Sequence, residues 1–86
     1  MTDDRPTARR VHESARTGRG HRRHRHTEFA ADDGARVVVT RYADRTARVT
    51  VFAPDGSRRE FRESNAGDDR WLLTAVGYRL EVTAPV

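Results

Sequence analysis

The chain has no cysteine among its 86 residues. This absence excludes disulfide bonds, thiol catalysis and metal sites with cysteine ligands. Lysine is missing as well, so the 17 Lys and Arg residues are all arginine. Codon usage in a GC-rich genome would produce the same preference, so the choice of arginine does not by itself indicate a phosphate site. The placement of the arginines is therefore more informative than their identity.

Long apolar segments are also absent. No apolar run approaches the roughly 18 residues that a membrane-spanning helix needs. The arginines near the N-terminus are not followed by the apolar segment of a secretory signal. We therefore expect no membrane partner and a cytoplasmic location, and the length of 86 residues predicts one domain at most.

Positive charge is concentrated near the N-terminus. Residues 1–27 hold eight arginines and three acidic residues, a net +5, whereas residues 28–86 hold nine arginines and ten acidic residues, a net −1. Apart from Met1, residues 1–26 have Val11 as their only sizeable apolar side chain, and they have no aromatic residue. Such a segment cannot bury enough surface to offset its chain entropy. We predict a disordered basic arm over residues 1–26 and a folded domain over residues 27–86.

Three turn signals predict a short antiparallel meander from Phe29 to Phe61. Asp32-Asp33-Gly34 and Pro54-Asp55-Gly56 suit a type I turn followed by a left-handed glycine, and Ala43-Asp44-Arg45 lies between them. If each loop has three residues, every apolar cross-strand pair falls on one face, an arrangement that a one-residue slip would destroy. The expected pairs are Phe29 with Val37, Val37 with Val51, Val39 with Val49, and Val49 with Phe61. The expected strands are residues 27–31, 35–42, 46–53 and 57–63.

The segment over residues 70–76 fits two structures. As a strand it places Trp71 and Leu73 on one face. As a short helix it has Asp68 as N-cap and Gly77 just after its end. We favour the strand.

The predicted fold class is mainly β, a small antiparallel meander or partly closed barrel of about five or six short strands. The alternative is an α+β fold with one short helix near residues 68–76. Residues 78–83 alternate as a further strand, and the charged strand 57–63 is typical of a protected sheet edge. The second face of the sheet carries Tyr42 and Phe52, so either the barrel closes or this face packs on another chain.

Catalytic and metal-binding chemistry has little support. A nucleophile needs a base within hydrogen-bond reach, and the predicted domain contains no histidine, so we expect no enzyme. The spacing His21-x-x-His24-x-His26 could present imidazoles to a transition metal. Arginines lie between these histidines and repel a cation, so we expect neither a metal nor another cofactor.

We predict a non-enzymatic small binding module whose arm contacts nucleic-acid phosphates without strong sequence preference. The arm has no aromatic side chain, so any stacking on bases would fall to Tyr42 and Phe52. The alternative is a protein–protein interaction module, a small accessory subunit or a homodimer that docks through the second face, with these two aromatics, or through a sheet edge. The arginines expected to bind phosphates are Arg9, Arg10, Arg16, Arg19, Arg22, Arg23 and Arg25.

Overall fold

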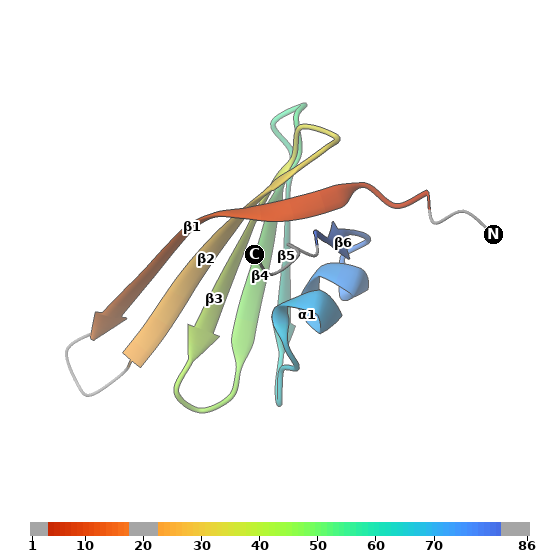
Figure 1. The fold of residues 1–86 in the computed structure, drawn as a ribbon. Helices are drawn as coiled ribbons and strands as arrows, with labels where there is room; N and C mark the ends of the chain where they lie inside the picture. The colour runs from red at the N-terminus through yellow and green to blue at the C-terminus, as the bar shows by residue number, and fades with distance from the viewer. Residues whose placement is uncertain (1–3, 18–22, 82–86) are drawn as a thin grey trace, which may run out of the picture.

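The computed structural model describes residues 4–17 and 23–81. These residues form a six-stranded mixed sheet, curved into a half-barrel, with one short helix on its inner side (Figure 1). The predicted mainly β fold with a partly closed barrel is confirmed. The strand order in the sheet is β5-β4-β3-β2-β1-β6. The elements are β1 (Thr7–Thr17), β2 (Arg23–Ala31), β3 (Arg36–Tyr42), β4 (Ala47–Phe52), β5 (Arg58–Glu63), α1 (Asp69–Ala75) and β6 (Arg79–Leu80).

Three hairpin turns fix the register from β2 to β5. Gly34, Arg45 and Gly56 have φ angles of 88°, 71° and 88°, the left-handed conformation that ends a three-residue loop. The aspartate before each of them accepts a hydrogen bond from the main-chain N–H two positions later, which stabilises the turn locally. The predicted register is confirmed. The observed pairs include Phe29 with Val37, Val37 with Val51, Val39 with Val49, and Val49 with Phe61.

The N-terminal segment differs from the predicted disordered arm and from the predicted domain boundary at residue 27. β1 pairs antiparallel with β2, and β2 already begins at Arg23. Ala8 is fully buried, and the Arg10 guanidinium lies 3.3 Å from the Asp69 carboxylate. The prediction considered only apolar side chains, whereas β1 is held by main-chain pairing and by ion pairs to distant residues. The part of the arm over residues 1–3 and 18–22 lies outside the described residues.

The ambiguous C-terminal segment is a helix, so the favoured strand is wrong. The Asp68 carboxylate accepts a hydrogen bond from the Trp71 N–H (2.9 Å), and Gly77 follows the helix with φ of 93°. α1 buries Leu72 and Leu73 completely, whereas Trp71 remains 46% exposed. A strand would have placed Trp71 and Leu73 on one face, whereas here one is exposed and the other is buried. The helix agrees with the N-cap at its beginning and with the left-handed glycine after its end.

β6 makes the sheet mixed instead of purely antiparallel. It pairs in parallel with the beginning of β1. Arg79 N–H of β6 donates a hydrogen bond to Pro6 C=O, and the N–H of the following residue, Glu81, donates one to Ala8 C=O, both at 2.9 Å. The predicted strand over residues 78–83 thus shortens to two residues, and residues 82 and 83 lie outside the described part.

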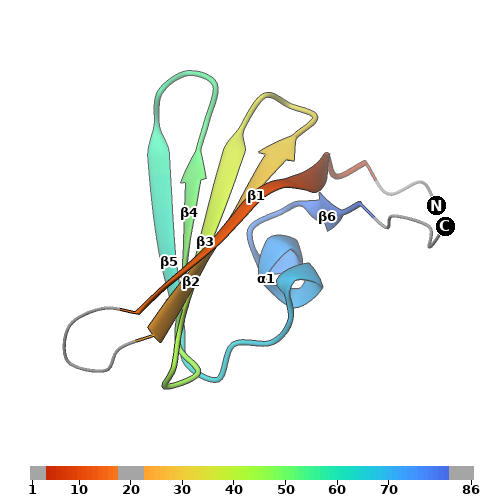
Figure 2. The same cartoon turned by 60° about the vertical axis from the view of Figure 1, so that its left-hand side comes forward.

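The core lies between the inner face of the sheet and α1, which Figure 2 shows beside β6 on that face. Apolar side chains from four strands and from the helix region make up this core. The buried apolar residues are Ala8, Phe29, Ala35, Val37, Val39, Ala47, Val49, Val51, Leu72, Leu73, Val76 and Tyr78. The opposite face of the sheet has no helix over it in the described residues, and it is the candidate functional surface.

Candidate nucleic-acid interface

The outward face of β2 to β5 is the face turned away from α1. Its members alternate along each strand with the buried core residues. Four arginines and two glutamates lie on it, a net charge of 4 − 2 = +2 without the two histidines. The face therefore attracts anions. Its residues are His24, His26, Glu28, Ala30, Arg36, Val38, Thr40, Tyr42, Arg48, Thr50, Phe52, Arg58, Glu60 and Arg62.

Two arginines lie directly opposite each other on this face. Arg48 of β4 pairs in register with Arg62 of β5, an arrangement of like charges that costs free energy in a sheet. Arg62 forms a long ion pair with Glu60 of its own strand, with Nε 3.9 Å from Oε1. Among the described residues, no carboxylate lies within ion-pair distance of Arg48. The positive charge of Arg48 is therefore not neutralised within this part of the chain.

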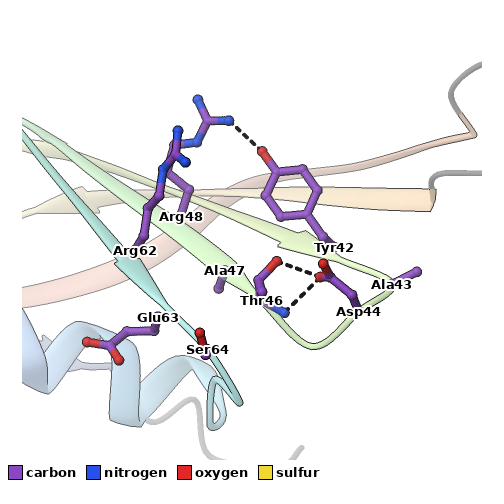
Figure 3. A pocket seen from close by; sticks show the side chains of 9 residues that line it. All are labelled: Tyr42, Ala43, Asp44, Thr46, Ala47, Arg48, Arg62, Glu63 and Ser64. Atoms are coloured by element: carbon purple, nitrogen blue, oxygen red, sulfur yellow. Dashed lines mark hydrogen bonds between the residues drawn. The ribbon is translucent and has the colours of Figure 1, made fainter.

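The phenol of Tyr42 holds the Arg48 guanidinium in place. Arg48 Nη2 donates a hydrogen bond to the Tyr42 hydroxyl at 2.7 Å (Figure 3), and Arg48 Cζ lies 6.0 Å from the centroid of the Tyr42 ring. Arg48 Nε is buried and has no hydrogen-bond partner. The guanidinium thus keeps its full charge beside a neutral partner, the Tyr42 hydroxyl, and a charge of this kind is suited to pairing with an anion from outside.

A cavity of about 550 Å³ opens beside this pair, at the end of the β3–β4 hairpin. Figure 3 shows Arg48 and Arg62 extending in the same direction, with the Tyr42 ring next to them. The cavity thus has a basic and aromatic side. The lining residues are Tyr42, Ala43, Asp44, Thr46, Ala47, Arg48, Arg62, Glu63 and Ser64.

Two histidines extend the same surface onto β2. His24 is the register partner of Tyr42, and their ring centroids lie 6.3 Å apart. The His26 ring packs edge-on against His24 at 5.1 Å, and its Nδ1 lies 2.9 Å from Thr40 Oγ1. We call Tyr42, Arg48, Arg62, His24 and His26 the Tyr42 cluster. In the described part of the chain, no three His, Asp or Glu side chains are grouped to hold a metal ion, and His21 lies outside that part.

Phe52 forms a second aromatic position on the outward face. Its side chain is 42% exposed, and Arg36 and Arg58 flank it as cross-strand neighbours. Arg36 is paired with Glu28 at 2.8 Å. Phe52 and the half-buried Tyr42, both predicted as partner-face residues, therefore lie on one face with basic side chains around them.

Three of the seven predicted phosphate-binding arginines have described side chains, and these three are not gathered in one place. Arg9 lies 3.1 Å from Asp32, Arg10 is paired with Glu13 and Asp69, and Arg25 lies 3.4 Å from Glu13. Arg9 is on the outward side, whereas Arg10 and Arg25 alternate onto the inner side. Arg16 and Arg23 belong to β1 and β2. Arg19 and Arg22 lie outside the described residues.

The sequence contained an unused signal for the Tyr42 cluster. Arg48 precedes Val49 and Arg62 follows Phe61, so the predicted pairing of Val49 with Phe61 places the two arginines opposite each other on the second face. The partner of His24 was not predictable in the same way, because β2 was expected to begin at residue 27.

Comparison with protein-family models, with curated proteins and with solved structures gives no match for this chain. In the described residues no helix has the length and apolar character required to cross a membrane. The chemistry of the outward face is therefore the basis for assigning a function.

Proposed function

We propose that the chain is a non-enzymatic nucleic-acid-binding module that uses its outward face as well as the N-terminal arginines. The observation that carries the proposal is Arg48, a half-buried guanidinium without a carboxylate partner in the described residues, opposite Arg62 and bonded to Tyr42. A phosphate bound there would accept hydrogen bonds from Arg48 and would reduce its repulsion with Arg62.

The exposed aromatic side chain on the same face favours single-stranded nucleic acid. A base of a single strand can stack on Phe52, and its phosphates can then reach the arginines on either side. Stacking tolerates every base, because each has a π face, so little sequence preference is expected. Duplex bases are already stacked and would not reach Phe52.

The N-terminal arginines have a smaller part in this proposal than the charge distribution alone predicts. Arg9, Arg10 and Arg25 each have a carboxylate within 3.5 Å. A phosphate would compete with that carboxylate, so each of these arginines adds less net attraction than an unpaired one. The other predicted arginines, Arg16, Arg19, Arg22 and Arg23, add to the net positive charge of the N-terminal segment, and positive charge favours association with phosphates.

Fluorescence anisotropy with a labelled single-stranded oligonucleotide tests the proposal. Arg48→Ala should weaken binding about tenfold, the loss expected for one charge-assisted hydrogen bond. Arg70→Ala is the matched control, because it removes the same charge from an exposed position on α1, on the other side of the sheet. It should change the affinity less than about twofold.

The salt dependence separates this function from its alternative. Phosphate contacts should make the affinity fall steeply between about 50 mM and about 200 mM salt. Equal effects of the two variants, or no binding at the lower salt concentration, would contradict the proposal. Either result would favour the protein-interaction alternative, in which Phe52 and Tyr42 contact a protein partner.

A further inference from the structure

The strand β5 lies at one edge of the sheet and has a free side for pairing. In the described residues, β4 is its only neighbour. The hairpin between them closes with a hydrogen bond from Ala53 N–H to Ser57 C=O (2.9 Å). Main-chain hydrogen bonding alternates along an antiparallel pair. The N–H and C=O groups of Phe61 therefore point towards β4, whereas those of Glu60 and Arg62 point towards the free edge of the sheet.

The side chains of β5 are complementary to a second copy of the same strand. When two β5 strands run antiparallel with Phe61 facing Phe61, Arg59 faces Glu63 and Glu60 faces Arg62 in both halves of the pair. Arg59, Phe61 and Glu63 lie on the inner side of the sheet, whereas Glu60 and Arg62 lie on the outward side. Each charge thus meets the opposite charge on its own side, which stabilises a cross-strand pair.

The neighbouring registers do not share this match. A shift of the pairing by one residue places inward side chains opposite outward ones. Centring the pair on Glu60 places Glu60 against Glu60 and Arg58 against Arg62, and centring it on Arg62 places two arginines together. Charges generally protect an edge strand against pairing. In β5 they exclude the wrong registers and favour one.

The exposed ring at the centre of β5 supports the same pairing. Phe61 is 38% exposed although it faces the core side of the sheet, and Arg59 Cζ lies 5.8 Å from its ring centroid. In the symmetric pair the two Phe61 residues occupy a position without main-chain hydrogen bonds, where facing side chains are closest. The other edge of the sheet is less suited to pairing, because it consists of the two-residue β6 and of the part of β1 beyond it, which has a register shift between Arg10 and His12.

We propose that two copies of the chain form a dimer through an antiparallel pair of their β5 strands, centred on Phe61, so that the two sheets become continuous. The proposal is independent of nucleic-acid binding. The interface consists of one short strand from each copy, so we expect dissociation within the micromolar to about 1 mM range.

Sedimentation velocity over that concentration range tests the pairing with charge reversals. Glu60→Arg and Arg62→Glu each create like-charge pairs at the junction, so each variant alone should remain monomeric where the wild-type chain dimerises. An equimolar mixture of the two variants should form a heterodimer, because every reversed charge then meets its opposite. The double variant Glu60→Arg/Arg62→Glu should dimerise like the wild type. Both residues are exposed, and circular dichroism checks that each variant is folded.

A wild-type chain that remains monomeric across the range would overturn the proposal. Dimers that persist in both single variants would also overturn it, and so would monomeric single variants whose mixture and double variant fail to associate.

Discussion

Arg41 of β3 and Asp69 of α1, which are 28 residues apart in the chain, form an ion pair with Nη2 2.8 Å from Oδ1. The Asp69 side chain is only 18% exposed, and it also accepts a hydrogen bond from Arg10 of β1. One carboxylate therefore connects the helix to two strands. A partly buried pair of this kind is screened by solvent less than a surface pair.

Replacing this carboxylate should loosen α1. Asp69→Asn removes the charge that both arginines contact, so the free energy of unfolding should fall by about 1–2 kcal/mol. Urea denaturation followed by circular dichroism measures the change. Glu28→Gln is the control, because it breaks the exposed pair with Arg36, and it should change the stability by less than about 0.5 kcal/mol. Equal losses would show that α1 does not depend on Asp69.

Ionisation of Tyr78 should make the protein less stable in alkaline solution. Burial, and then the hydrogen bond from its hydroxyl to Asp33 (3.0 Å), raise the pKa of Tyr78 above its ordinary value of 10.0. The unfolded chain therefore loses this proton at a lower pH than the folded protein. The stabilisation is complete below about pH 10 and is lost as the pH rises towards the folded-state pKa.

Tyr78→Phe is the variant that isolates this effect. The thermal midpoint of the wild type should fall between about pH 9 and about pH 11, and the variant should show a smaller fall. Parallel decreases in the two proteins would assign the alkaline loss to other groups.

The packing of β1 can be tested with a charge introduced at its beginning. Ala8 is fully buried, so Ala8→Asp buries an unpaired carboxylate. The free energy of unfolding should fall by about 2 kcal/mol or more. Val11→Asp is the control at a position that is 47% exposed, and it should be nearly neutral. If the thermal midpoint of Ala8→Asp equals that of the wild type, β1 does not pack on the sheet in solution.

Local chemistry in the sequence was sufficient to predict the meander. The Asp-Gly turns and the alternating valines of β3 and β4 act over a few residues, so the register from Phe29 to Phe61 followed from them. The helix was harder, because Trp71 and Leu73 also fit a strand, and only the end signals, Asp68 and Gly77, distinguish the two structures. β1 could not be predicted, since Arg10 meets a carboxylate 59 residues away in the chain.

The candidate site shows the same division. The opposition of Arg48 and Arg62 follows from the predicted register, and the outward position of Tyr42 and Phe52 follows from alternation along β3 and β4. The carboxylates that neutralise Arg9 and Arg25 come from other strands and loops. Only the folded chain shows which arginines are paired and which are not.

An NMR titration of the ¹⁵N-labelled chain with a short single-stranded oligonucleotide tests the proposed outward-face site most directly. We predict that amide shifts will change at Tyr42, Arg48 and Phe52, and that those of Trp71 and Leu72 on α1 will not. Raising the salt concentration should reverse the changes. The absence of shift changes at low salt, or changes confined to α1, would contradict the assignment of nucleic-acid binding to the outward face.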